Sequence, residues 1–133
     1  DFAGTVSLLN NHASNEGGGI AFNSAANNQL LTNLVIANNT AGSRGAGVVI
    51  HNNSFYIKKS TIVNNVSSYA AGVFVSHNAV VDIENSIIMT NCKIEGDFKI
   101  RQSIISSNSQ INNYKKTKAE KIFLLGEGTK ISL

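Results

Sequence analysis

The sequence contains no proline, no tryptophan and one cysteine, and only 14% of its 133 residues are charged. The single cysteine, Cys92, cannot form an internal disulfide, so we expect it to be a small buried hydrophobe. No apolar run approaches the roughly 18 residues of a membrane-spanning helix. No charged segment precedes a short apolar one, as in a targeting signal. The sequence thus predicts no membrane span in this chain and no internal disulfide. We also expect no cofactor.

The few charges are unevenly distributed along the chain. Residues 1–92 hold three basic and four acidic side chains, whereas residues 93–133 hold eight and four. The most basic stretch, residues 115–121, lacks the interleaved aromatic side chains that are typical of nucleic-acid binding. We therefore expect a solvated segment there and no nucleic-acid partner.

Asparagine and serine take the place of charge as the polar residues. The sequence has 19 Asn and 15 Ser, together with 15 Ile and 10 Val against 8 Leu. β-Branched residues favour strands, and Asn, Ser and Gly favour turns. This composition predicts an all-β chain.

An internal repeat places an aliphatic residue three positions before an asparagine. The Asn positions step by 28, 26, 26 and 17 residues. The copies are Leu8/Asn11, Ile36/Asn39, Ile62/Asn65, Ile88/Asn91 and Ile105/Asn108. A second feature follows each copy, a segment led by glycine or alanine in which apolar residues alternate. These segments contain Ile20/Phe22, Val48/Ile50, Val73/Val75 and Phe98/Ile100.

Alternation with a period of two is typical of a strand with one buried face. A unit of about 25 residues cannot bury that face alone, whereas stacked copies bury it against each other. We therefore predict a parallel β-helix, or solenoid, with about four to five coils of roughly 25–28 residues and three short strands per coil. In this arrangement Val48 and Val73 pair in parallel.

Stacking gives the repeated asparagines a structural role. An Asn side chain can both donate and accept, so identical residues in successive coils can form a hydrogen-bonded ladder. The predicted ladder consists of Asn11, Asn39, Asn65 and Asn91; the alternative is that these amides bind a ligand. Small residues before the strands allow tight corners, namely Gly18, Ala46, Ala71 and Gly96.

The aliphatic-x-x-Asn and Gly-Gly-x-Ile patterns resemble the repeats of right-handed parallel β-helices of the pectin-lyase-like superfamily. They are most similar to the Phe-x-x-Asn and Gly-Gly-Ala-Ile repeats of polymorphic outer-membrane proteins and related bacterial surface proteins. The likeness covers roughly residues 4–108, with Leu or Ile in place of Phe. It implies a right-handed coil and an extracellular or cell-surface location, in a functionally mixed group.

Enzymes on this fold resemble one another in carrying clustered carboxylates on the outer face of stacked strands. Asp82 and Glu84 lie two residues apart on one predicted strand, outward because Val81 and Ile83 point inward. Their spacing suits glycoside hydrolysis, but we find no matching acid one coil away, at Thr61 or near Leu34. We expect a solubilising outer face, with a catalytic pair as the alternative.

Two further side-chain sets are candidate sites. His51 and His77 lie 26 residues apart, but a metal site needs at least one more ligand and Cys92 belongs to a different turn, so we predict no metal. Between the inward residues of the glycine-led strands lies an outward row of Ala21, Val49, Phe74 and Lys99. Val49, Phe74 and Lys99 are the candidate binding residues of an exposed apolar stripe. The alternative is that a loop, or the apolar segment 121–125, covers this row.

We divide the chain into β-helix coils over residues 1–108 and a cap or connecting segment over residues 109–133. The first coil begins almost at once, so its open end offers unpaired backbone groups for self-association. The leading functional hypothesis is a non-catalytic exported surface protein, acting as an adhesin, passenger or structural module with a glycan or protein ligand. The alternatives are a polysaccharide lyase, hydrolase or carbohydrate-binding β-helix, and a filament-forming subunit.

Overall fold

The structure, a computed structural model, describes residues 4–23, 28–76, 78–89, 92–94, 97–105, 109–112 and 130–132. All regular elements among these residues are β-strands, and the strands are short, with two to six residues each. The prediction of an all-β chain is confirmed for this part of the sequence.

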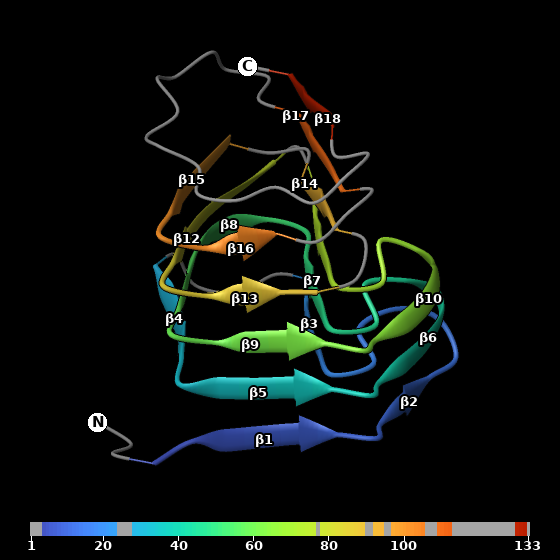
Figure 1. Ribbon diagram of the computed structural model, residues 1–133. Coiled ribbons are helices and arrows are strands. Elements are labelled where there is room, and N and C mark those ends of the chain that lie inside the picture. Colours follow the sequence, from blue (N-terminus) through green and yellow to red (C-terminus); the bar gives the residue numbers. More distant parts are fainter. Residues whose placement is uncertain are drawn as a thin grey trace.

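The strands form four parallel sheets, which we name A to D (Figure 1). Sheet A contains β1 (Val6–Leu9), β5 (Leu34–Ala37), β9 (Thr61–Val63), β13 (Ile87–Ile88) and β16 (Ile104–Ile105). Sheet B contains β2 (His12–Ala13), β6 (Thr40–Arg44) and β10 (Val66–Tyr69). Sheet C contains β3 (Ile20–Phe22), β7 (Val48–Ile50), β11 (Val73–Val75), β14 (Lys93–Ile94), β17 (Gln110–Asn112) and β18 (Lys130–Ser132). Sheet D contains β4 (Gln29–Thr32), β8 (Asn53–Lys58), β12 (Ala79–Glu84) and β15 (Asp97–Arg101).

Strands one repeat apart in the sequence pair in the same direction. Val48 pairs with Ile20 on one side and with Val73 on the other, all in parallel. In sheet A the register joins Leu8, Ile36 and Ile62, the three aliphatic residues of the first copies of the repeat. The predicted parallel stacking of successive copies is therefore confirmed, and the arrangement fits a parallel β-solenoid.

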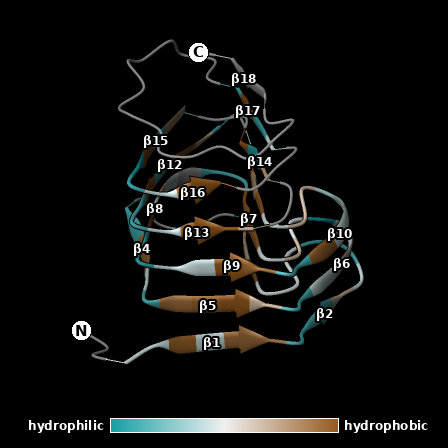
Figure 2. Ribbon diagram, viewed as in Figure 1, coloured by the Kyte–Doolittle hydropathy of each residue, from teal (hydrophilic) through white to brown (hydrophobic). Residues whose placement is uncertain are grey.

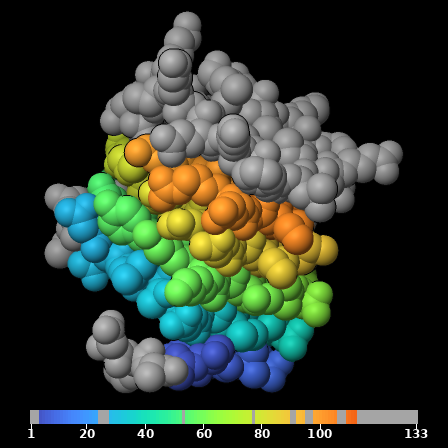
Figure 3. Space-filling model, turned by 60° about the vertical axis from the view of Figure 1, so that its left-hand side comes forward, coloured from blue at the N-terminus to red at the C-terminus, as the bar shows by residue number. Residues whose placement is uncertain are grey.

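Along the chain the described strands visit the sheets in the order A, B, C, D three times, then A, C, D, and finally A, C, C. Figure 3 shows the successive passes as stacked bands of colour, from blue to orange. The prediction of three strands per repeat is therefore wrong for the first three passes, because each has an additional strand in sheet B. The sequence stretch responsible, Asn11–Ala13 and its equivalents, is polar and short, so it lacks the apolar alternation that marks the other strands.

Left-handed backbone conformations turn the chain at three stacked corners. Asn10, Asn38 and Asn64 have positive φ where sheet A ends, directly before the ladder asparagines. At the corner between sheets D and A the equivalent residues are Asn33, Lys59, Asn85 and Gln102. Gly17, Gly45 and Ala70 turn the chain before sheet C. Asn and Gly adopt this conformation most readily, which explains why they recur at these corners.

The inward side chains of sheets A, C and D form one apolar core. It contains stacked columns such as Ile36, Ile62, Ile88 and Ile105, all nearly inaccessible to solvent. Glycines allow this packing where sheet C begins: a Cβ on Gly47 would lie 2.8 Å from Cγ2 of Ile62. Figure 2 shows the alternation of apolar strands and polar corners along the stack.

The sheets are open, and β1, β2, β3 and β4 form one end of the stack (Figure 1). Leu8, Ile20, Phe22, Leu31 and Leu34 at this end are only partly buried against the core. Beyond residue 108, β17 and β18 extend sheet C in the same parallel sense.

Candidate functional site

The candidate acid pair lies on the outer face of sheet D. Asp82 and Glu84 alternate on β12 with Val81 and Ile83, which are fully buried, so both carboxylates project outward. The neighbouring strands place cations beside them: Lys58 comes from β8 and Arg101 from β15, and both pair with Glu84 in the register. The structure thus brings together one acid pair and two cations from three adjacent strands.

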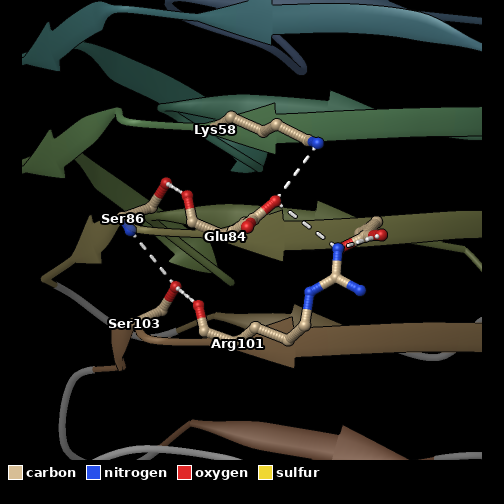
Figure 4. Close-up of polar contacts among 6 residues, drawn as sticks. Lys58, Glu84, Ser86, Arg101 and Ser103 are labelled. Atoms are coloured by element: carbon tan, nitrogen blue, oxygen red, sulfur yellow. Dashed lines mark hydrogen bonds and ion pairs between the residues drawn. The ribbon is translucent and has the colours of Figure 1, made fainter. Parts of the chain in front are cut away.

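Both carboxylates form ion pairs (Figure 4). Nη2 of Arg101 donates to the two carboxylate oxygens of Asp82 at 3.0 and 2.9 Å, and lies 3.5 Å from Oε2 of Glu84. Nζ of Lys58 lies 3.1 Å from the same Glu84 oxygen. The hydrogen bond from Lys58, together with the positive charges of Lys58 and Arg101, holds the pKa of Glu84 below its ordinary value. Glu84 is therefore ionised at neutral pH.

The register corrects the expected neighbours of the acid pair. The positions one repeat before Asp82 and Glu84 are Tyr56 and Lys58, and not Thr61 or a residue near Leu34. Thr61 and Leu34 begin strands of sheet A, one corner beyond the strands of sheet D. No apolar residue in the sequence marks the corner between sheets D and A. The cations were missed for the same reason, since their position beside Glu84 depends on offsets of 26 and 17 residues.

A serine ladder supports the corner that follows the acid pair. Ser60, Ser86 and Ser103 are buried and stacked. The backbone N–H of Ser60 donates to Oγ of Ser86 and that of Ser86 to Oγ of Ser103, both at 3.2 Å. Each hydroxyl in turn donates to the carbonyl two residues earlier, which for Ser86 is that of Glu84. Figure 4 shows Ser86 and Ser103 beside the ion pairs, each hydrogen-bonded to the residue two positions earlier, Glu84 on β12 and Arg101 on β15.

The predicted exposed stripe on sheet C is wrong. Val49 and Phe74 do lie in one row, but Val49 is completely buried and Phe74 is only 3% exposed. Side chains that precede these strands in the sequence cover them. Ala70 packs against both, and the guanidinium of Arg44, at the end of β6, lies 5.1 Å from the centroid of the Phe74 ring. Lys99 is exposed but belongs to sheet D, where it pairs with Asp82, so it does not continue this row.

A second charged cluster, which the sequence argument missed, lies over this covered row. Glu16 accepts from Nε of Arg44 at 2.9 Å and lies 2.6 Å from Nε2 of His51. The rings of His51 and Phe74 also pack edge to face, with their centroids 5.7 Å apart. Glu16, Arg44 and His51 thus link neighbouring copies of the repeat and shield Phe74 from water. Their separations of 28 and 35 residues give no local sequence signal.

The predicted asparagine ladder lies inside the stack. Asn39 accepts at Oδ1 from the side-chain amide of Asn11 and donates from Nδ2 to Oδ1 of Asn65, both at 3.0 Å. The same Nδ2 atom donates to the carbonyl of Leu8. Asn39 and Asn65 are buried, and their amides are fully engaged with protein groups, which supports a structural role over ligand binding. Asn91 lies outside the described residues.

Cys92 is buried, and burial raises the pKa of its thiol to about 11. Its backbone N–H donates to Oγ of Ser109 at 3.2 Å. A buried neutral thiol packs as a small hydrophobe.

The described residues contain no group of three or more His, Cys, Asp or Glu side chains arranged to hold a metal ion. His77, the partner proposed for His51, and the basic residues 115–121 lie outside the part that the structure describes. Within the described part there is also no helix long and apolar enough to cross a membrane.

Comparisons with known proteins leave the chain without an assigned family. No protein-family model matches the sequence, and neither a curated protein nor a solved structure matches it. The functional argument therefore depends on the geometry described above.

Proposed function

We propose that this chain is a non-catalytic module of an exported surface protein, built as a right-handed parallel β-helix of four to five coils. In this role the stack is a rigid spacer or display scaffold, as expected for an adhesin, passenger or structural module. The resemblance of its repeats to those of bacterial surface proteins supports the location, the handedness and the coil count.

One observation carries the non-catalytic part of the proposal: Asp82 and Glu84, the acid pair that the described residues place on the face of sheet D, are engaged by cations. Glycoside hydrolysis needs one carboxyl group that stays protonated near neutral pH so that it can act as a general acid. The environment of Glu84 has the opposite effect, because Lys58 and Arg101 lower its pKa. Asp82 is held by the same guanidinium through both of its oxygens. This arrangement is typical of ion pairs that join neighbouring strands.

A carbohydrate-active protein is the second candidate function. It is supported by the arrangement of Asp82, Glu84 and Arg101, in which one guanidinium gathers two carboxylates on an accessible sheet face. The half-buried aromatic ring of Tyr56 lies in the same row as Asp82 and provides an apolar surface beside these charges.

A pair of experiments separates the two functions. An antibody against this chain should label intact cells of the source organism as strongly as permeabilised ones, and protease treatment of intact cells should remove the signal. Labelling only after permeabilisation would contradict the surface location.

On a polysaccharide panel we expect no release of reducing ends by the wild type. Turnover that disappears in D82N, but persists in the matched variant K99Q on the same face, would favour the carbohydrate-active alternative.

A further inference from the structure

The outer face of sheet A carries no charge and is mostly apolar. Inward and outward residues alternate, and the register aligns the outward residues of five strands in one row. This row consists of Ser7, Val35, Thr61, Ile87 and Ile104. Ile87 and Ile104 are 40% and 38% exposed, although the residues that follow them in the same strands, Ile88 and Ile105, are buried.

A second outward row lies beside the first and is also apolar. The register joins Leu9, Ala37 and Val63, of which the small Ala37 is buried, and Met89 follows β13 at the same end of the sheet. Leu9 and Met89 are each 45% exposed. None of the five strands of sheet A contains a charged residue. We call the two rows together the sheet A face; in Figure 2 most of its strands are coloured as hydrophobic.

Polar corners flank the sheet A face on both sides. The residues with positive φ on one side are Asn10, Asn38 and Asn64, and those on the other are Asn33, Lys59, Asn85 and Gln102. Lys59 is the one charged residue among these seven. An apolar centre with a rim of polar side chains is the usual composition of a protein interface, and its lack of charge is the feature that most distinguishes an interface centre from other surface.

Charge restricts what can cover this face. The outer face of sheet D carries Lys58, Asp82, Glu84, Lys99 and Arg101, and that of sheet C is covered by the cluster around Arg44 and Glu16. Packing either of these faces on sheet A would bury charges against apolar side chains, which is costly. Of the outer faces of sheets A, C and D, sheet A is therefore the one that can cover a second sheet A face without burying charge.

We propose that the sheet A face is a self-association surface, on which the sheet A face of a second copy of this chain packs. A contact of one face with the same face of another copy has two-fold symmetry, so each residue contributes twice. Two sheets can pack face to face at about 10 Å, with outward side chains interdigitating, as the inner faces of β-sandwiches do. The two stacks then lie side by side, which differs from association through their open ends.

The size of the face sets the expected strength. Five strands at about 4.8 Å and four residues at about 3.3 Å give a face of roughly 20 by 13 Å, or about 250 Å². This is well below the approximately 800 Å² per partner of a stable interface. We therefore expect a weak dimer that forms at high protein concentration or when two copies are held close together on one surface. The inference does not depend on the proposed surface role.

Sedimentation velocity over a concentration series tests the proposal. The wild type should show a monomer–dimer equilibrium, and the double variant I87T/I104T should weaken it at least about tenfold. Threonine suits these positions because Thr61 already occupies the same row. The matched control is L30T, since Leu30 is an exposed apolar residue on the outer face of sheet D. A wild type that remains monomeric at the highest concentration overturns the proposal.

Cross-linking tests the location of the contact. Thr61 lies on β9, the central strand of sheet A, so T61C should bring two thiols together and give a covalent dimer under oxidising conditions. The control L30C should not, and the native Cys92 is buried. Equal dimer formation by T61C and L30C overturns the proposal. So does association that I87T/I104T leaves unchanged, because contact through the open ends would not involve these side chains.

Discussion

At the scale of the residue, consecutive asparagines have different roles. In the pair Asn38–Asn39, the first adopts the left-handed conformation that turns the chain, and the second is buried and hydrogen-bonded to both neighbouring copies. Asn64 and Asn65 repeat this division. Each double asparagine at the end of sheet A, namely Asn10–Asn11, Asn38–Asn39 and Asn64–Asn65, therefore marks a corner and, directly after it, a rung of the ladder.

The position of an asparagine in the ladder determines the cost of removing it. N39A removes the hydrogen bonds from Nδ2 to the carbonyl of Leu8 and to Oδ1 of Asn65, although Oδ1 of Asn65 keeps the backbone N–H of Asn39 as a donor. It also removes the acceptor of the backbone N–H of Asn11, and each polar group that is left unsatisfied in the interior costs about 1–3 kcal/mol. We expect N39A to lower the free energy of unfolding by about 2–4 kcal/mol in urea denaturation. The control N11A removes an exposed amide at the end of the ladder and should cost about 1 kcal/mol or less. Equal costs for the two variants would contradict this assignment.

The buried thiol provides a second residue-scale prediction. Because the pKa of Cys92 is raised to about 11, the native thiol is both neutral and inaccessible at pH 8. A thiol reagent should therefore react with the native protein only through unfolding, and fully in concentrated urea. Since the folded pKa lies above the unfolded one, the stability linked to the neutral thiol is present at neutral pH and is lost as the pH rises towards 11. Rapid reaction of the native protein would show that Cys92 is accessible.

At the scale of the element, the sequence predicted which strands pair with each other better than it predicted which side chains are exposed to solvent. The alternation in the glycine-led segments identified β3, β7 and β11 and their parallel order. It also predicted which residues of these strands face away from the core. It could not predict what covers them, because Arg44, at the end of β6, and Ala70, which follows β10, stand in segments that have no apolar alternation.

The sheet A face was missed for a related reason. The repeat was identified from the aliphatic residue before the asparagine, which is the inward one. In Ile87–Ile88 and Ile104–Ile105 the first isoleucine points outward and the second inward. A pair of adjacent aliphatic residues in a strand with one buried face is the signal that indicates an apolar outer surface.

The ion pairs between β8, β12 and β15 predict a pH dependence. Because the folded pKa of Glu84 is lowered, its contribution to stability is complete above its ordinary pKa and is lost as the pH falls through the folded value. E84Q should therefore be less stable than the wild type at pH 7, and the two should converge as the pH is lowered below 4. Urea denaturation at a series of pH values measures the difference.

High salt is the control for this prediction, since it should reduce the difference at pH 7 by screening Lys58 and Arg101 from an accessible carboxylate. A difference between E84Q and wild type that does not change with pH would indicate a packing effect in place of the ion pairs.

At the scale of the whole molecule, each strand contacts mainly its neighbours one repeat before and after. Stability in such a stack is approximately a sum of local terms and contacts between adjacent copies. Strands in the middle have a partner on each side, whereas β1, β2, β3 and β4 have one. The two kinds of strand should therefore open with different free energies.

Native-state hydrogen exchange measures this gradient. We expect the backbone amides of β8, β9 and β12 to be protected most strongly, and those of β1 and β4 to exchange at least about tenfold faster. The exchange rates to compare are those of residues that pair in the register, such as Ser7 with Val35 and Thr61 in sheet A, and Leu31 with Ile57 and Ile83 in sheet D. Uniform protection along the stack would show that the described strands unfold as one cooperative unit, which would contradict the additive picture.

The sheet B side of the molecule varies in length while the other sides keep their register. Between β9 and β11 the chain makes an excursion through β10, whereas β13 leads to β14 over only a few residues, and sheets A and C remain paired on both occasions. The length of the chain on this side can therefore change without breaking the pairing within sheets A and C. This makes the connection through β10 a natural position for grafting a foreign peptide, and a route by which related chains can diversify what they present while conserving their scaffold.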